Sequence, residues 1–230
     1  MSNFLGRALG TALLTRVDDA TDVYLVRHGQ QVRAGKDSPE SMAYDAHLSV
    51  QGRAQALAVG EALAGAGLDA VYSSNLARAH DTGKAIAAHH GVEVVVDERL
   101  KEVGIFRDVP GEQSFEQAVG TERALAASRQ MIETLTWDSI PLGEGSAEFR
   151  ARVHGAIWEI ARRHAGDQVA IACHGGVINA FLAEEYGLSR DFLFRPAHAG
   201  ITRVRFADDR AIMLTANEIT HLEAVDLLSF

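Results

Sequence analysis

Short apolar runs alternate with helical patterns along this chain, and their order constrains the fold more than any other feature. Val23–Val26 and Val71–Tyr72 are rich in β-formers and predict two buried strands. Between them, Ser49 can cap a helix rich in small residues. The residues expected on its buried face, at helical spacing, are Ala54, Leu57, Ala58 and Ala62. Strand, helix and strand in this order predict a parallel β/α unit.

The second half of the chain repeats this order and then departs from it. Ser146 precedes a second helical pattern, which leads into an apolar strand at Val169–Ala172. Its apolar stripe is predicted to comprise Phe149, Val153, Ile157 and Ile160. Near the end, the alternation over Thr202–Phe206 and the turn at Asp208-Asp209 predict an antiparallel hairpin at an edge of the sheet.

Length and composition indicate one domain. The 230 residues are 47% hydrophobic, enough for one sizeable core, and no linker or repeat divides residues 21–230. Residues 1–20 are expected to form an N-terminal extension, frayed or docked, because Gly6 and Gly10 interrupt any apolar core of a targeting signal. The single cysteine, Cys173, and the absence of an apolar run of about 18 residues favour a reducing cytoplasm.

The net charge of the chain limits the kinds of partner that it is expected to bind. A formal net charge of −9 argues against nucleic acid and against anionic membranes as partners. An anionic substrate would therefore need a locally basic pocket. A homodimer is a reasonable expectation for an acidic α/β protein of this size. No cluster of ligands has the spacing of a metal site, because His89-His90 would point in different directions.

Two predicted strands end in segments with unusual chemistry. Arg27-His28-Gly29 follows the first, and Cys173-His174-Gly175-Gly176 follows the strand at Val169–Ala172. Ligands gather at the carboxyl ends of parallel strands, and glycine lets the backbone approach a ligand closely. Arg78 follows the strand at Val71–Tyr72 and opens a helix, where free N–H groups favour an anion. Three strand ends thus contribute cationic or donor groups to one edge.

This combination suits a phosphoryl group. Guanidinium groups such as Arg27 and Arg78 can bind phosphate oxygens in bidentate fashion. An imidazole can attack phosphorus when its other nitrogen is held by an acceptor. Either His28 or His174 could take that role, and the residue types alone do not decide between them.

These motifs resemble those of the histidine phosphatase superfamily, which includes the cofactor-dependent phosphoglycerate mutases. The resemblance makes His28 the nucleophile and Arg27 a phosphate-binding residue, because the family carries both in an Arg-His-Gly motif. It assigns His174 to the later His-Gly motif of the pocket. Arg78, in Tyr72–Ala79, is similar to the second pocket arginine, and Leu48-Ser49 with Gly52 and Gln55 resembles the first-helix signature. The match runs from about Val23 to Phe206.

The same resemblance implies a proton donor. Leu100-Lys101-Glu102 is similar to the family segment that supplies it, so Glu102 is the expected general acid. The following residues lack the tryptophan-glutamate-glycine continuation common in the family. Asp108 and Glu112 therefore remain alternative donors.

The implied fold is α/β, a three-layer αβα sandwich with a mostly parallel central sheet and an antiparallel edge strand. The implied reaction needs neither metal nor cofactor. His28 attacks phosphorus while Glu102 protonates the leaving oxygen, and water then hydrolyses the phosphohistidine with the same carboxyl group as base.

Substrate specificity is expected to come from the loops. Gln30 and Arg33 stand where phosphoglycerate mutases usually place other residues, which counts against a mutase. Gln30, Arg33, Gly175 and His198 are possible substrate contacts. The sequence favours a phosphomonoesterase acting on a small phosphorylated metabolite or a phosphoprotein. A phosphomutase and an inactive phospho-ligand binder remain as alternatives.

Overall fold

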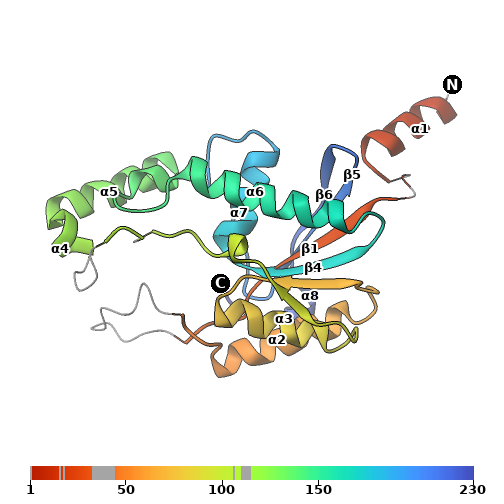
Figure 1. Cartoon of the computed structure of the whole chain (residues 1–230), viewed down its shortest axis with the longest axis horizontal. Helices are drawn as coiled ribbons and strands as arrows, with labels where there is room; N and C mark the ends of the chain where they lie inside the picture. Colours follow the sequence, from red (N-terminus) through yellow and green to blue (C-terminus); the bar gives the residue numbers. More distant parts are fainter. Residues whose placement is uncertain (1, 16, 18, 33–44, 106, 110–114) are drawn as a thin grey trace.

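The computed structural model describes residues 2–15, 17, 19–32, 45–105, 107–109 and 115–230. Within them, six strands form one sheet with helices on both faces (Figure 1). The strands are β1 (Thr21–Arg27), β2 (Ala70–Ser73), β3 (Val94–Val96), β4 (Gln168–Cys173), β5 (Ile201–Ala207) and β6 (Arg210–Glu218). The longer helices are α1 (Ser2–Ala12), α2 (Val50–Leu63), α3 (Ala77–Ala87), α5 (Thr121–Thr134), α6 (Ser146–Arg163) and α7 (Gly175–Glu185). The short helices are η2 (Glu98–Leu100), α4 (Phe115–Val119), η3 (Trp137–Ser139) and α8 (Thr220–Glu223).

The strand order is β3-β2-β4-β1-β5-β6. The first four strands run parallel to their neighbours, whereas β5 is antiparallel to β1 and pairs with β6 as a hairpin. The fold is therefore an α/β sandwich with a mostly parallel sheet and an antiparallel pair at one edge, which confirms the predicted fold class. The hairpin turns at Asp208, whose φ of 55° lies in the left-handed region that aspartate tolerates.

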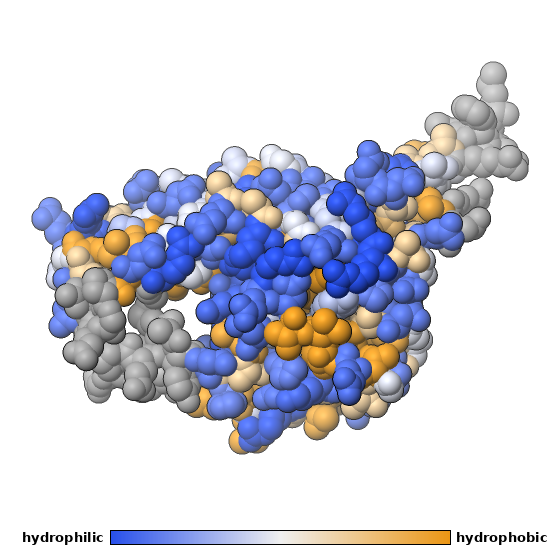
Figure 2. Space-filling view, viewed as in Figure 1, coloured by the Kyte–Doolittle hydropathy of each residue, from blue (hydrophilic) through white to orange (hydrophobic). Residues whose placement is uncertain are grey.

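Helices α6 and α7 cover one face of the sheet, and α2, α3 and α8 cover the other. The predicted stripe on α6 is confirmed, because Phe149, Val153, Ile157 and Ile160 are all buried against the sheet. Figure 2 shows the outward side of α6 as a hydrophilic band, as expected for the solvent face of an amphipathic helix. Cys173, at the end of β4, is fully buried in this core.

The predicted buried face of α2 was wrong, although its cap was right. Ser49 Oγ accepts a hydrogen bond from the Gly52 N–H (3.0 Å). Leu57, however, is 60% exposed, and the buried positions include Gly52 and Gly60. A Cβ at Gly60 would overlap the main-chain oxygen of Ala85 on α3. At Gly60 the two helices pack backbone to backbone, so the buried face of α2 includes this glycine together with Val59 and Leu63, and Leu57 lies outside it.

The residues before β1 include one helix, α1, which projects from the molecule near the β5–β6 hairpin (Figure 1). Two arginines of the hairpin contact this extension. Arg205 donates to the main-chain oxygen of Leu14 (3.4 Å), and Arg210 donates to that of Thr11 (3.1 Å). Leu14 itself is fully buried. No helix among the described residues is long and apolar enough to cross a membrane.

Asp22 holds the antiparallel edge to the parallel part of the sheet. Its carboxylate, 1% exposed at the start of β1, accepts hydrogen bonds from Arg203 and from Arg205 (2.6 and 2.7 Å) on β5. We expect Asp22→Ala to lower the free energy of unfolding by about 3 kcal/mol, near the lower end for a broken buried pair because both arginines are partly exposed. Urea unfolding would show a lower midpoint at an unchanged slope.

The control is an exposed aspartate. Asp81 pairs with Lys84 at 3.5 Å on the surface of α3, so Asp81→Ala should cost less than about 1 kcal/mol. Burial alone would raise the pKa of Asp22, but the bonds from Arg205 and Arg203 outweigh it and the pKa is lowered. The stabilisation is therefore present above the unfolded value of 3.8 and is lost as the pH falls below it. Equal midpoints for the two variants would contradict this role of Asp22.

Candidate active site

Three neighbouring strands bring the predicted site residues to one edge of the sheet. Arg27 on β1 is in register with Cys173 on β4, and the His28 N–H donates to the Cys173 oxygen (2.9 Å). The next residue after Cys173 is His174, so the two histidines leave adjacent strands together. Strand β2, on the other side of β4, ends at Ser73 and leads into α3, whose second residue is Arg78.

His28 is buried and held in one orientation. Its Nδ1 lies 2.7 Å from the main-chain oxygen of Gly29, so Nδ1 carries the proton and Nε2 keeps its lone pair. Arg78 Nε donates to that Nε2 (3.2 Å). Burial lowers the pKa of His28 well below its usual value, and electrostatic interactions with His174 and Arg78 act in the same direction. The ring is therefore neutral, with a nucleophilic nitrogen next to an arginine.

His174 lies beside His28, with 5.1 Å between the ring centroids. The side chain is fully buried at the N-terminus of α7. Its Nε2 is 2.7 Å from Ser74 Oγ, whereas its Nδ1 makes no hydrogen bond to any described residue. Burial again lowers the pKa well below the usual value. This buried ring nitrogen has no partner among the described residues, and the ring itself is not part of the pocket lining.

Glu102 faces the same pocket from the segment after η2. Its carboxylate accepts hydrogen bonds from the Val103 N–H (3.0 Å) and from the Gly176 N–H (3.1 Å) in the first turn of α7. Burial raises the pKa of Glu102, and these two bonds and the charges of Arg78 and Arg27 only partly offset that rise. A Cβ at position 176 would overlap the carboxylate, so this close approach requires glycine.

The segment that carries Glu102 is fixed on both sides by a buried ion pair. Arg152 on α6 binds Glu144 through two bonds (2.7 and 2.8 Å). Arg152 also donates to the main-chain oxygens of Arg99 (2.7 Å) and Lys101 (3.0 Å), just before Glu102. Glu144 accepts from the Gly104 N–H (3.1 Å), just after it. Sequence reasoning missed both residues, because each lies about 40 or more positions from the segment it holds.

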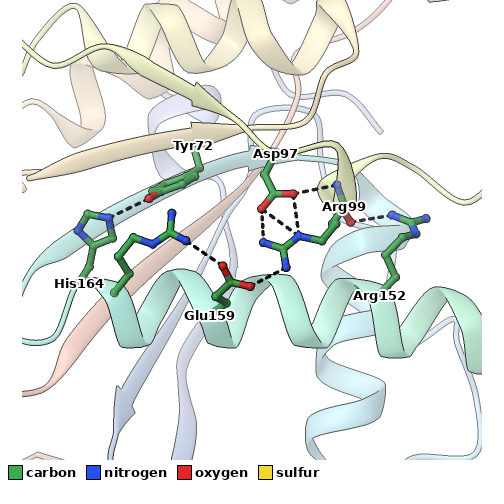
Figure 3. A network of polar contacts seen from close by, with 7 residues as sticks. Tyr72, Asp97, Arg99, Arg152, Glu159 and His164 are labelled. Atoms are coloured by element: carbon green, nitrogen blue, oxygen red, sulfur yellow. Dashed lines mark hydrogen bonds and ion pairs between the residues drawn. The ribbon is translucent and has the colours of Figure 1, made fainter.

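A second set of contacts ties the start of this segment to α6 (Figure 3). The Arg99 guanidinium binds Asp97 (2.7 Å) and Glu159 (2.7 Å), and it thereby links η2 to the helix. In the same view Arg152 reaches the Arg99 main chain, and Tyr72 on β2 contacts His164 (3.0 Å). The proton-donor candidate is thus anchored to the longest helix of the described chain.

Arg27 is held by the segment that precedes β5. Its guanidinium donates to the Pro196 oxygen and lies 3.0 Å from His198 Nε2, while His198 Nδ1 is 3.0 Å from Ser229 Oγ. Burial lowers the pKa of Arg27 to about 10, which leaves it charged at neutral pH. Arg78 is buried, and burial lowers its pKa as well.

The other residues that the sequence suggested as substrate contacts or proton donors do not all lie in the pocket. Gly175 lines the pocket, and His198 contacts Arg27. Gln30 does not reach the pocket, because its side chain accepts from Ser49 Oγ (2.8 Å), and Gln31 lines the pocket instead. Asp108 is exposed and paired with Arg107 at 3.4 Å, outside the pocket lining. Arg33 and Glu112 lie outside the described residues.

The pocket has a volume of about 630 Å³. Arg27, His28, Arg78, Glu102, Gly175 and Gly176 form its polar floor. Its outer wall, which the sequence did not indicate, comprises Gln31, Trp137, Asn179, Asp191, Phe192, Leu193, Phe194, Arg195 and Pro196. In the described part of the chain, no group of three or more His, Cys, Asp or Glu side chains is placed to hold a metal ion.

Chemically, the floor combines a neutral imidazole, the buried Arg78, the half-buried Arg27 and a carboxyl group with a raised pKa. Such groups can bind a dianion, attack its central atom and protonate what leaves. A phosphoryl group fits this arrangement because its oxygens match the arginines.

Comparisons with known proteins agree with this geometry. Residues 23–219 match the family model described as "Histidine phosphatase superfamily (branch 1)". A relative from Salmonella arizonae, named probable phosphoglycerate mutase GpmB, is 27% identical over 216 residues, with 88% of this chain and 95% of the relative covered.

Solved structures with a similar fold include a phosphatase and a mutase. A mycobacterial glucosyl-3-phosphoglycerate phosphatase is 25% identical, with a TM-score of 0.70 over 86% of this chain and 99% of the other. A phosphoglycerate mutase from Bacillus anthracis shares the fold at 16% identity, with a TM-score of 0.71 over 90% and 97% of the two chains. Because the family model spans most of the chain, including every strand end of the site, the protein belongs to the histidine phosphatase superfamily.

Proposed function

We propose that this protein is a phosphomonoester hydrolase that works through a phosphohistidine on His28. The observation that carries the proposal is the neutral, buried His28, whose Nε2 lies beside Arg78 while Gly29 holds Nδ1. Only an unprotonated nitrogen can attack phosphorus, and a lowered pKa keeps it unprotonated at neutral and mildly acidic pH.

In the first step, His28 Nε2 forms a bond to phosphorus as the bond to the leaving oxygen breaks. Glu102 gives its proton to that oxygen, and its raised pKa supplies the protonated form. The Gly29 oxygen stabilises the positive charge that develops on the imidazole. Arg27, Arg78 and the free Nδ1 of His174 would bind the three non-bridging oxygens.

In the second step, water attacks the phosphohistidine and Glu102 takes its proton. The N–P bond breaks, His28 is regenerated, and inorganic phosphate leaves the pocket. No step requires a metal, because the two arginines supply the positive charge. We also propose a reducing cytoplasm as the compartment, supported by the single buried cysteine.

The second candidate is a phosphomutase, supported by the relative named as a probable phosphoglycerate mutase. A mutase would return the phosphoryl group to another hydroxyl of the bound substrate and would exclude water. The deciding experiment incubates the enzyme with 3-phosphoglycerate and with a generic aryl phosphate, with chelator present. Free phosphate from the aryl ester supports the hydrolase, whereas isomer exchange without phosphate release supports the mutase. Loss of all activity in chelator would overturn the metal-independent mechanism.

Arg78→Ala should weaken binding of inorganic phosphate about 10- to 100-fold, because it removes charge-assisted hydrogen bonds worth about 1.5–3 kcal/mol each. The product inhibition constant measures this directly. Arg163→Ala serves as the control, because Arg163 is exposed and pairs with Glu159 away from the pocket. Unchanged phosphate inhibition in Arg78→Ala would show that this arginine does not bind the phosphoryl group.

A further inference from the structure

The pocket is divided into two chemically different halves. The floor carries the charged groups that would hold a phosphoryl group. The wall above it contains five apolar residues beside its polar ones: Trp137, Phe192, Leu193, Phe194 and Pro196. A pocket of about 630 Å³ is larger than the phosphoryl group needs, so most of it is available to the alcohol part of a substrate.

Buried polar groups hold the aromatic part of the wall in place. Asp191 is 1% exposed, and its carboxylate accepts from the main-chain N–H of Trp137 (2.8 Å), from Ser146 Oγ (2.5 Å) and from Arg150 Nε (2.6 Å). These bonds fix Trp137 at the start of η3. The Trp137 ring then packs on that of Phe192, with 4.4 Å between the ring centroids.

A second buried residue joins the wall to the floor. Asn179 on α7 accepts from the N–H groups of Leu193 (3.2 Å) and Phe194 (3.3 Å). Its amide nitrogen donates to the Phe194 oxygen (3.0 Å) and to the Gly175 oxygen (3.1 Å) on the floor. Asn179 therefore ties Leu193 and Phe194 to the first turn of α7, beside the floor.

Two charged residues of the wall already have protein partners. Among its described residues, Asp191 is buried and used by its three donors. Arg195 donates to the Phe230 oxygen (3.0 Å) and lies over the Phe230 ring, 5.7 Å from its centroid. The five apolar side chains of the wall offer contact to an apolar alcohol, and burying a methylene against them gains about 0.8 kcal/mol.

We propose that the wall formed by Trp137 and Phe192 selects phosphomonoesters with an apolar or aromatic alcohol, which packs on these rings while its phosphoryl group occupies the floor. This inference rests on the proposed hydrolase function and specifies its substrate class. Small polar esters, such as glycerol phosphate and phosphoglycerate, would lack the contact and would be poor substrates.

The test uses ethyl, butyl and hexyl phosphate, because their alcohols leave with nearly equal basicity and differ mainly in apolar length. We expect kcat/KM to rise about two- to fourfold per added methylene, and to be higher for hexyl phosphate than for glycerol phosphate by at least tenfold. In Trp137→Ala and in Phe192→Ala, the ratio between hexyl and ethyl phosphate should fall at least fivefold. Trp137→Phe, which keeps a ring, should retain most of that ratio.

Tyr186→Ala is the matched control, because it removes a partly exposed ring at the opposite end of α7 and should leave the ratio unchanged. A wild-type series that is flat with chain length, or one in which glycerol phosphate or phosphoglycerate is the best substrate, would overturn the assignment of the wall while leaving the hydrolase intact. No phosphate release from any ester would instead refute the proposed function.

Discussion

His28→Ala is expected to abolish the phosphoenzyme and to lower phosphate release by roughly three orders of magnitude or more. The imidazole is the one group of the pocket floor that combines an unprotonated ring nitrogen, burial and a fixed tautomer. Without it, phosphorus has no protein nucleophile, and only binding and charge stabilisation remain. A short incubation with radiolabelled substrate, quenched in base, would trap the N–P bond in the wild type and leave the variant unlabelled.

His89→Ala provides the control for this experiment. His89 is exposed after the end of α3, on the side of the sheet away from α6 and α7, so its removal should keep both labelling and turnover. Residual turnover above a few per cent in His28→Ala would contradict the assignment. Label that persists in His28→Ala but disappears in a His174 variant would transfer the nucleophilic role to His174, the histidine beside it.

Glu102→Gln is expected to slow esters of alkyl alcohols by about 100- to 1,000-fold, and esters of acidic phenols far less. An alkoxide needs a proton to depart, whereas an acidic phenolate does not. The amide can still accept one of the bonds that hold the carboxylate, so the loop should keep its place. Because Glu102 also serves the second step, the release of alcohol in the first turnover, rather than the steady-state rate, is the proper measurement.

The pH dependence gives a separate test of the same residue. Burial raises the pKa of Glu102, so the protonated form persists above its usual range and declines as the pH rises through the raised value. Wild-type activity toward alkyl esters should fall as the pH rises through the raised pKa of Glu102, and Glu102→Gln should not show this fall. Asp108 is exposed outside the pocket lining, so Asp108→Asn should behave as the wild type. Equal slowing of both ester classes in Glu102→Gln would point to another acid.

Local patterns predicted the architecture well where one face of an element is apolar. The stripe on α6 and the alternation on β5 are strong periodic signals, and both elements formed as expected. The pattern failed on α2, where Leu57 is exposed and Gly60 is buried. Hydrophobicity cannot reveal that two helices approach closely enough to require a missing side chain. The close packing depends on how α2 and α3 fit together, and neither segment of sequence shows this by itself.

The floor of the site could be predicted because its residues lie in short motifs at strand ends. Parallel neighbours β1 and β4 must bring His28 and His174 together once their strands pair in register. The wall could not be predicted, because Trp137 precedes α6 and Phe192 follows α7, and neither lies in a recognisable motif. They meet through the packing of their rings and through the hydrogen bond from the Trp137 main chain to Asp191. Gln30 and Gln31 show the same limit, since a difference of one residue decides which side chain enters the pocket.

The reactivity of Cys173 can be used to measure how fast the core beneath the site opens. Cys173 is the only cysteine in the chain, it is fully buried between Ala172 and His174, and burial raises the pKa of its thiol. A thiol reagent should therefore react with the native protein only as fast as the core beneath the site opens. The rate of modification in mild denaturant would time that opening, and cysteines introduced on the surface could be labelled selectively without first removing the natural one.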